Sequence, residues 1–190
     1  MKIYFVRHGQ TDWNIQHRLQ GSADIPLNKT GINQAQILKE KINNLDIDFI
    51  ISSPLKRALD TANIINSDKH LPLSIDSALI ERSFGVLEGV NGNDYDKYLF
   101  WDYEKNYEYK NVEKVQDFLK RVATFLDNLY AKYPDKNILL VSHNGVNIAA
   151  SCYFNGFPSN KDLLSIKLDN CNYEIYEKNI ISNNIPMSTP

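Results

Sequence analysis

The stretch that decides the fold is Ile3-Tyr4-Phe5-Val6-Arg7-His8-Gly9-Gln10-Thr11-Asp12-Trp13-Asn14. Its first four residues are apolar and β-prone, and a basic residue, a histidine and a glycine follow them. This pattern is typical of a strand that delivers a reactive group into a loop at the carboxyl edge of a sheet, where open α/β sheets bind their ligands. We therefore expect Arg7 and His8 to lie in a ligand site.

Two later segments repeat this arrangement. Residues 49–57 and 138–145 each contain an apolar run followed by a turn of small residues, with Arg57 or His143 at or just beyond the tip. Two histidines and two arginines at strand ends indicate an anion site.

Composition limits the class of protein. The chain has 190 residues, 43% of them hydrophobic and 23% charged, which favours one globular domain. The net charge of -2 gives no broad basic surface for nucleic acid or an anionic membrane, so an anion site must be local. The N-terminal apolar run is too short for a signal peptide and no run approaches a membrane span, which predicts a cytoplasmic protein. We expect Cys152 and Cys171 to be free thiols.

Helical periodicity fills the spaces between the apolar runs. Thr30 is the expected N-cap of a helix that turns Ile32, Ala35, Leu38 and Ile42 inward. Further helices are expected at about 55–65, 112–133 and 146–153, and short strands at 73–75, 164–168 and 173–176, with the last two forming a hairpin. Residues 182–190 are expected to be frayed. Strands that alternate with helices predict an α/β fold: a three-layer αβα sandwich with a mostly parallel sheet, helices on both faces and an antiparallel C-terminal strand.

The least regular part of the chain is the segment from about 90 to 110. It is rich in aromatic residues, namely Tyr95, Tyr98, Phe100, Trp101, Tyr103, Tyr107 and Tyr109. So many large rings do not suit a disordered linker, so we expect a partly helical excursion that covers something. A lid over a pocket and a flap packed on the sheet are both compatible with this composition.

Residues 7–14 resemble the signature R-H-G-[EQ]-[ST]-x-W-N of the histidine phosphatase superfamily, whose fold is like that of cofactor-dependent phosphoglycerate mutase. Four further segments resemble motifs of the same family in the same order: Leu27-Asn28-Lys29-Thr30-Gly31 with Gln34-Ala35, residues 52–62, residues 79–89, and Val141-Ser142-His143-Asn144-Gly145. The joint match runs from Lys2 to about Gly145 and is far more specific than any one motif.

The residue types themselves suit displacement of an alcohol from a phosphate monoester, which needs a nucleophile, donors to the phosphoryl oxygens and an acid for the departing oxygen. A neutral imidazole is nucleophilic near pH 7, so we assign His8 as the nucleophile. Arg7 and Arg57 can bind phosphoryl oxygens bidentately. Further donors are expected from His143, from the side chain of Asn14 and from the backbone amide of Asn144, if that residue opens a helix.

The resemblance implies that Glu81 is the proton donor to the leaving oxygen and then the base for the incoming water, whereas Glu88 matches a structural glutamate. It also implies that Gln20 and Gly21, together with Gln10 and Thr11, lie near the phosphate or its ester group. The arginines beside the two histidines would repel a cation, so no metal ion is expected. The sequence also lacks a dinucleotide-binding fingerprint, and no cofactor is expected. His17 and His70 have no supporting motif and are assigned no role.

Within the family, the sequence favours a metal-independent phosphatase for a small phosphate monoester. Aligned on Glu81, the mutases resemble E-R-x-Y-G-x-L-Q-G-L-N-K, whereas this chain has Phe84 for the tyrosine and Gly92 for the lysine. No arginine occurs in residues 90–112. The pair Glu81-Arg82 keeps a phosphoglycerate mutase as an alternative, and a non-catalytic module that binds a phospho-ligand is another. The aromatic segment favours a partly apolar leaving group without selecting a sugar, nucleoside-like, ribazole-like or phosphotyrosine ester, and it would equally suit a homodimer interface.

Overall fold

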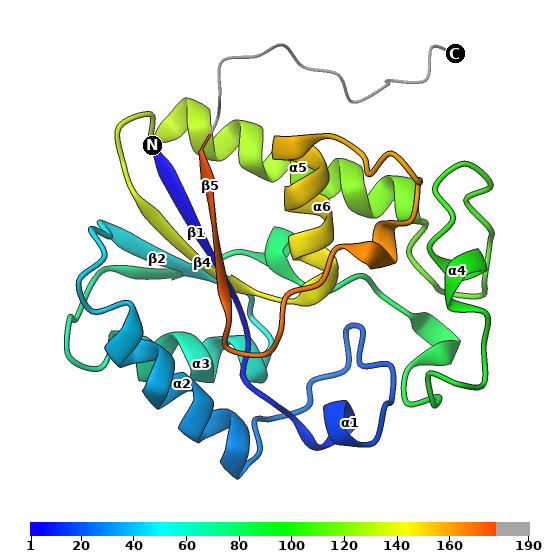
Figure 1. Ribbon diagram of the computed structural model, residues 1–190, viewed down its shortest axis with the longest axis horizontal. Helices are drawn as coiled ribbons and strands as arrows, with labels where there is room; N and C mark the ends of the chain where they lie inside the picture. Colours follow the sequence, from blue (N-terminus) through cyan, green and yellow to red (C-terminus); the bar gives the residue numbers. More distant parts are fainter. Residues whose placement is uncertain (178–190) are drawn as a thin grey trace.

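A computed structural model describes residues 1–177 of the chain. In these residues, five strands form one sheet in the order β3-β2-β4-β1-β5 (Figure 1). The three central strands are the apolar runs β1 (Lys2–Arg7), β2 (Phe49–Ser52) and β4 (Ile138–Ser142). All five residues of β4 are buried, as expected for a parallel strand covered on both faces. The edges are β3 (Leu73–Ile75), which is parallel to β2, and β5 (Tyr173–Glu177), which is antiparallel to β1.

Helices cover both faces of this sheet. On one face, α2 (Lys29–Lys41) and α3 (Lys56–Asn66) share a core with the apolar side chains that β1, β2 and β4 turn toward them. On the other face, α5 (Val115–Lys132) and α6 (Asn144–Asn155) pack in a larger core (Figure 1). The predicted three-layer αβα fold with an antiparallel C-terminal strand is therefore confirmed.

The register of the central strands brings their carboxyl ends together. Arg7 of β1 pairs with Ser142 of β4, and Ser52 of β2 pairs with Val141 of β4. Residues that follow these strands directly therefore lie side by side at one edge of the sheet, which is where parallel sheets bind ligands.

The start of α2 differs from the sequence-based prediction. Asn28, and not Thr30, caps this helix, because its side-chain oxygen accepts a hydrogen bond of 2.9 Å from the amide of Gly31. Gly31 faces inward, where a Cβ atom would lie 2.1 Å from the carbonyl oxygen of Gln10. Ile32 is consequently 42% exposed, so the prediction that it packs inward is wrong.

Two other helices have different lengths from those predicted. Helix α5 begins at Val115 rather than near Val112, because Lys114 is extended and the amide of Glu113 donates to the carbonyl oxygen of Ser83 at 3.0 Å. Helix α6 begins at Asn144 and extends beyond the predicted 146–153.

The predicted C-terminal hairpin is wrong. Residues Leu163–Ser165 form a 3-10 turn, η3, and residues 166–168 pair with no strand in the described part of the chain. Side chains take the backbone groups that a strand would use: Asn144 Oδ1 accepts from the amide of Leu168, and Arg7 donates to its carbonyl oxygen. The predicted frayed residues 182–190 lie outside the described residues.

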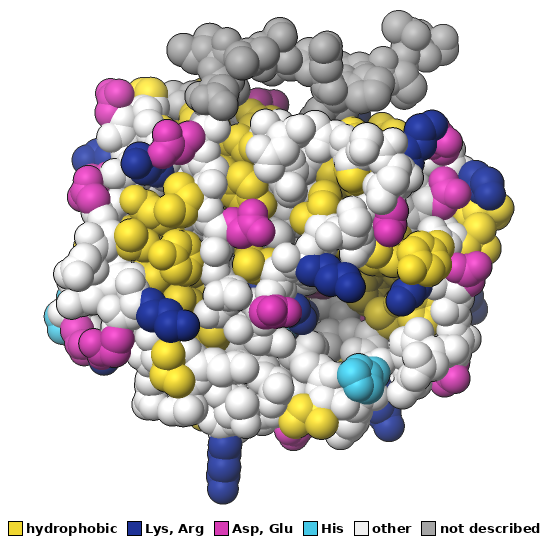
Figure 2. Space-filling model, in the orientation of Figure 1, with side chains coloured by type: hydrophobic (Ala, Val, Ile, Leu, Met, Phe, Trp, Pro, Cys, Tyr) yellow, Lys and Arg dark blue, Asp and Glu magenta, His cyan; other side chains and the backbone are white. Residues whose placement is uncertain are grey.

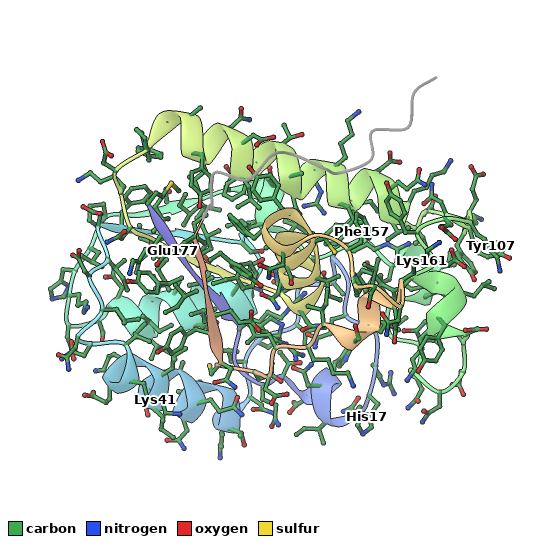
Figure 3. The ribbon with its side chains drawn as sticks, turned by 45° about the horizontal axis from the view of Figure 1, so that its top comes forward. His17, Lys41, Tyr107, Phe157, Lys161 and Glu177 are labelled. Atoms are coloured by element: carbon green, nitrogen blue, oxygen red, sulfur yellow. The ribbon has the colours of Figure 1, made fainter. Side chains whose placement is uncertain are left out.

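The aromatic segment is fastened to the body of the protein. The segment from 90 to 110 contains the short helix α4 (Lys97–Phe100). Phe100 and the next residue, Trp101, are buried. Tyr103 packs on Phe157 with ring centroids 4.7 Å apart, and Glu104 pairs with Lys161 at 2.5 Å. Figure 3 shows Phe157 and Lys161 from the connection after α6 on the same side of the molecule as Tyr107. The segment is thus tied at both the core and the surface, although its role as a lid stays a prediction.

Two expectations from composition can be compared with the structure. Cys152 and Cys171 are both buried and free. No helix in residues 1–177 combines the length and the apolar character that crossing a membrane requires.

Candidate active site

The two histidines of the sequence motifs lie together at the carboxyl edge of the sheet. The amide of His8 donates to the carbonyl oxygen of Ser142 at 2.9 Å, which holds the end of β1 beside the end of β4. The imidazole rings of His8 and His143 lie with their centroids 5.1 Å apart. Figure 2 shows the surface hollowed beside α1 (Asp12–Ile15), on the side toward which β1 runs, with Lys and Arg side chains at the edge of the hollow.

The backbone around His8 fixes which of its ring nitrogens is free. Nδ1 lies 2.7 Å from the carbonyl oxygen of Gly9, which can only accept, so Nδ1 carries the proton and Nε2 keeps its lone pair. Burial lowers the pKa of His8 well below its usual value, and the charges of Arg57 and Arg7 lower it further. His8 is therefore a neutral imidazole with an unprotonated Nε2.

His143 follows β4 directly as the N-cap of α6, and it is fully buried. Its Nε2 lies 2.9 Å from Ser53 Oγ, while its Nδ1 has no hydrogen-bond partner among the described residues. Burial, followed by the charge of Arg57, lowers its pKa well below the usual value. A buried, neutral ring with one unpaired nitrogen is suited to bind a polar ligand atom.

Two arginines bring positive charge to the same place. Arg57 is fully buried in the first turn of α3, and its terminal nitrogens donate to the carbonyl oxygens of Ala23 and Gly21 at 2.7 and 2.8 Å. Arg7 donates through Nη1 to the carbonyl oxygen of Leu168 at 2.7 Å. Burial lowers the pKa of Arg57 to about 10, so it remains charged at pH 7.

The arginines also leave donors unused. Within residues 1–177, Nε of Arg7 and Nε of Arg57 are buried without a hydrogen-bond partner. Buried polar groups are rarely left unpaired, so the unpaired nitrogens of Arg7, Arg57 and His143 indicate an anionic ligand.

The side chain of Glu81 lies against the N-terminus of α6. Its Oε2 accepts from the amide of Gly145 at 3.0 Å, and its Oε1 accepts from the amide of Arg82 at 2.9 Å. Burial raises the pKa of Glu81 despite these hydrogen bonds and the nearby arginines. A Cβ atom on Gly145 would lie 2.1 Å from Glu81 Oε1, so any side chain at this position would displace the carboxyl group of Glu81.

Glu88, the other glutamate of the motif that contains Glu81, has a structural function. Glu88 Oε1 accepts hydrogen bonds from the amide and hydroxyl of Ser22 and from the amide of Phe84. It therefore fastens the loop around Gly21 to the segment after Glu81, as a structural glutamate would.

The sequence predicts that four further residues bind phosphate. Asn144 is the first residue of α6, where backbone amides have no partner within the helix. Gln20 is buried, and its Oε1 lacks a partner in the described part of the chain. Gly21 has a φ of +51° and offers its carbonyl oxygen to Arg57. Asn14 Oδ1 accepts from the amide and hydroxyl of Thr11, which closes the cap of α1. Contact of these four residues with phosphate stays a prediction.

The family model of the histidine phosphatase superfamily (branch 1) matches residues 3–179 of the chain. The chain belongs to the histidine phosphatase superfamily. It is 40% identical to the uncharacterized phosphatase PhoE of Bacillus subtilis over 74% of this chain and 70% of that protein. It is 35% identical to the adenosylcobalamin/alpha-ribazole phosphatase of Escherichia coli over 77% of this chain and 75% of that protein.

Among solved structures, a mycobacterial glucosyl-3-phosphoglycerate phosphatase in complex with VO3 superposes with a TM-score of 0.80 at 26% identity, covering 92% of this chain and 91% of that chain. The family and the phosphatase assignment predicted from the sequence are confirmed. The named substrates of these relatives differ from one another.

Arg82 is part of the Glu81-Arg82 pair that keeps a mutase as an alternative on sequence grounds. In the structure its guanidinium binds backbone carbonyl groups. Its Nε donates to the carbonyl oxygen of Glu113 and its Nη1 to that of Phe100, both at 2.8 Å. Its guanidinium lies 4.3 Å from the ring centroid of Phe100 and 4.9 Å from that of Trp101. Arg82 therefore joins the aromatic segment to the segment that carries Glu81.

Sequence reasoning missed three residues that complete the site. Thr61 Oγ1 accepts from the amide of Gly9 at 3.0 Å and donates to the carbonyl oxygen of Arg57 at 2.7 Å, so it links the loop of His8 to α3. Ser53 orients His143, and the ring of Trp101 lies 3.1 Å from the place of a Cβ atom on Gly145. Thr61 and Ser53 stand inside the quoted motif of residues 52–62, which was the available signal, whereas Trp101 had none beyond its aromatic neighbours.

Metal ligands are a separate question. Among residues 1–177, no three His, Cys, Asp or Glu side chains are grouped so that they could hold a metal ion.

Proposed function

We propose that this phosphatase hydrolyses a small phosphate monoester through a phosphohistidine on His8, without a metal ion. The observation that carries this proposal is the pairing of a neutral imidazole, whose Nε2 is unprotonated, with buried arginine nitrogens that have no partner in the described chain. A nucleophile and unpaired cationic donors together suit attack on a phosphoryl group.

In the first step, Nε2 of His8 attacks phosphorus while the bond from phosphorus to the ester oxygen breaks. Glu81 gives its proton to that oxygen, and the alcohol leaves. The carbonyl oxygen of Gly9 holds the Nδ1 proton of the imidazole, which becomes cationic as the new bond forms. Arg7, Arg57 and His143 donate to the phosphoryl oxygens, with Ser53 Oγ donating to Nε2 of His143 so that Nδ1 carries the proton.

In the second step, the Glu81 carboxylate takes a proton from water, the water oxygen attacks phosphorus, and the bond to Nε2 breaks. His8 returns to the neutral form, Glu81 is protonated again and inorganic phosphate leaves. The raised pKa of the buried Glu81 suits a group that must first give and then take a proton.

Hydrolysis is favoured over phosphoglycerate mutation by the position of Arg82. A mutase must hold a second charged group at the leaving-group side, whereas here Arg82 is committed to the carbonyl oxygens of Glu113 and Phe100. The absence of arginine from residues 90–112 of the sequence supports the same conclusion.

The test is a panel of alkyl, sugar, nucleoside and aryl phosphates, read by release of inorganic phosphate with EDTA present. We expect release to continue in EDTA and to fall at least about 10³-fold in His8→Ala, because the nucleophile is then missing. Loss of turnover on chelation would overturn the metal-independent mechanism. Interconversion of 3-phosphoglycerate and 2-phosphoglycerate that needs 2,3-bisphosphoglycerate would indicate a mutase, and binding of phosphate without turnover of any ester would indicate a binding module.

A further inference from the structure

Glu81 lies in a stretch of irregular backbone, residues 78–83, which we call the acid segment. It begins within one short 3-10 turn, η1 (Ser77–Leu79), ends just before another, η2 (Gly85–Leu87), and belongs neither to the sheet nor to a long helix. Four of its carbonyl groups, those of residues 78, 79, 80 and 83, therefore accept hydrogen bonds from distant parts of the chain.

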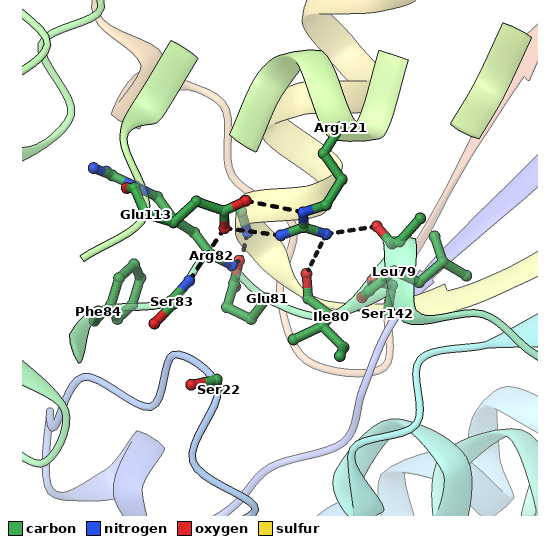
Figure 4. Close-up of polar contacts among 12 residues, drawn as sticks. Ser22, Leu79, Ile80, Glu81, Arg82, Ser83, Phe84, Glu113, Arg121 and Ser142 are labelled. Atoms are coloured by element: carbon green, nitrogen blue, oxygen red, sulfur yellow. Dashed lines mark hydrogen bonds and ion pairs between the residues drawn. The ribbon is translucent and has the colours of Figure 1, made fainter. Parts of the chain in front are cut away.

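Three consecutive carbonyl groups before Glu81 are held in this way. Arg121 Nη1 donates to the carbonyl oxygens of Ala78 at 2.7 Å and Ile80 at 3.1 Å. Between them, Leu79 accepts from Ser142 Oγ at 2.7 Å. Figure 4 shows Arg121 reaching from α5 to the acid segment, beside the end of β4.

The chain after Glu81 is held by Glu113. Its amide donates to the carbonyl oxygen of Ser83 at 3.0 Å, and its Oε2 accepts from the amide of Ser83 at 3.3 Å. The acid segment is thus fixed on both sides of the proton donor.

The two holding residues are themselves joined. Nε and Nη2 of Arg121 donate to the two carboxylate oxygens of Glu113, each at 2.9 Å (Figure 4). The side chains of Arg121 and Glu113 are only 27% and 21% exposed. A bidentate pair of this kind fixes orientation as well as distance, so one ion pair grips the backbone before and after Glu81.

We propose that Arg121, paired with Glu113, is a positioning residue for the proton donor Glu81. This inference rests on the proposed function, in which Glu81 protonates the leaving oxygen. Within residues 1–177, the Arg121 guanidinium donates hydrogen bonds to Ala78, Ile80 and Glu113, so it acts on Glu81 through the backbone of the acid segment. Small displacements of a catalytic group slow a reaction steeply, so loosening this grip impairs proton donation before it impairs phosphate binding.

The test compares two substrates that differ in their need for an acid. Departure of an alkoxide requires a proton, whereas 2,4-dinitrophenolate leaves readily without one. The ratio kcat/KM covers the steps up to departure of the alcohol, so later hydrolysis of the phosphoenzyme does not enter. In Arg121→Met we expect kcat/KM for an alkyl phosphate to fall about 10-fold or more through kcat, with KM unchanged, and kcat/KM for 2,4-dinitrophenyl phosphate to fall less than about 3-fold.

Matched controls on α5 separate positioning from general damage. Lys120→Met removes a positive charge from the adjacent, exposed position and should leave kcat/KM unchanged for both substrates. Leu129→Ala truncates a buried residue of the same helix and lowers stability, and any loss of activity it causes should be equal for the two substrates.

A second variant covers the outcome in which Arg121→Met does not fold. Glu113→Gln keeps the shape of the side chain and weakens its grip on Arg121, so it should show the same selective loss to a smaller degree. An open groove of about 730 Å³ adjoins Ala78 and Arg121, so water can reach the truncated site.

Glu81→Gln distinguishes failure of this inference from failure of the proposed function. If Glu81→Gln lowers kcat/KM equally for the alkyl phosphate and for 2,4-dinitrophenyl phosphate, Glu81 is not the acid and the proposed function fails at that step. If Glu81→Gln is selective for the alkyl phosphate while Arg121→Met and Glu113→Gln are not, the positioning role alone is wrong.

Discussion

The two sides of the candidate site are built in different ways. On the phosphoryl side, His8, His143 and Arg57 follow the ends of central strands or open the first turn of a helix, so strand register sets their positions. On the acid side, Glu81 and Trp101 lie in irregular segments that side-chain contacts hold together. The phosphoryl side is therefore as rigid as the sheet, whereas the acid side is only as rigid as its tertiary contacts.

This difference separates two kinds of functional effect. In the proposed mechanism, the phosphoryl side binds a group that every phosphate monoester shares, so damage there should affect all substrates alike. The acid side protonates the leaving group in that mechanism, so the effect of damage there should depend on how much protonation the leaving group needs. The following variants test this separation.

The largest effect is expected on the phosphoryl side, for Arg57→Gln. Removing a buried cation that faces the phosphoryl oxygens should lower kcat/KM about 10³-fold, equally for alkyl and 2,4-dinitrophenyl phosphate, and should weaken inhibition by inorganic phosphate. Steady-state kinetics with both esters measure this, and Lys56→Gln, at the exposed neighbouring position, is the control. Unchanged inhibition by phosphate would remove Arg57 from the anion site.

The next largest effect concerns the attachment of the aromatic segment. Phe100 is 2% exposed, and Phe100→Ala should lower the free energy of unfolding by about 3 kcal/mol, as expected for truncation of a buried aromatic ring. Tyr98→Ala on the same short helix, where the side chain is 61% exposed, should have almost no effect. Urea unfolding measures both. A loss below about 1 kcal/mol for Phe100→Ala would favour a lid that is detached much of the time over a packed flap.

Gly145→Ala should produce a smaller and selective effect on the acid side. The new methyl group would lie 2.1 Å from Glu81 Oε1, so the carboxyl group must move. We expect kcat/KM for an alkyl phosphate to fall about 30-fold, with a much smaller change for 2,4-dinitrophenyl phosphate and none in phosphate inhibition. Gly92→Ala is the control, because Gly92 is half-buried in a loop where a Cβ atom would have only the carbonyl oxygen of His17, at 3.2 Å, within 4 Å. Equal losses for both esters would contradict the separation between the two sides.

The smallest effect concerns pH and the two histidines. Their pKa values are lowered in the folded protein, so the unfolded chain binds protons near pH 6.5 that the folded chain does not. The stabilisation is complete above pH 6.5 and is lost as pH falls toward the folded pKa values, at up to about 1.4 kcal/mol per pH unit for each histidine. The free energy of unfolding, measured in urea between pH 5 and 7.5, should therefore rise less steeply with pH for His143→Asn than for the unsubstituted protein. Identical slopes would show that His143 is not held neutral.

The same contrast explains how much the sequence could predict. His8, Arg57 and His143 follow apolar runs, and the strands they follow were predicted correctly because buried parallel strands have a continuous apolar pattern. Glu81 could be placed only through the family resemblance, since nothing local marks a carboxylate in irregular backbone. Its partner Gly145 stood in a quoted motif, but the close approach between them is visible only in three dimensions.

The errors have a common physical cause. The strand predicted at 164–168 fails because Asn144 and Arg7, distant in sequence, take the backbone groups of Leu168. The helix predicted from Val112 begins late because Glu113 is bonded to Ser83. In each case a long-range side-chain or backbone contact overrides a local preference.

The most direct test of the account is identification of the phosphorylated residue. Glu81→Gln should slow hydrolysis of the phosphoenzyme, so this variant is mixed with 2,4-dinitrophenyl phosphate, quenched in alkaline denaturant and digested for mass spectrometry. The account predicts one phosphoryl group on His8, labile to acid and absent from the His8→Ala,Glu81→Gln double variant. A phosphoryl group on any other residue, or phosphate release with no phosphoenzyme in either variant, would contradict it.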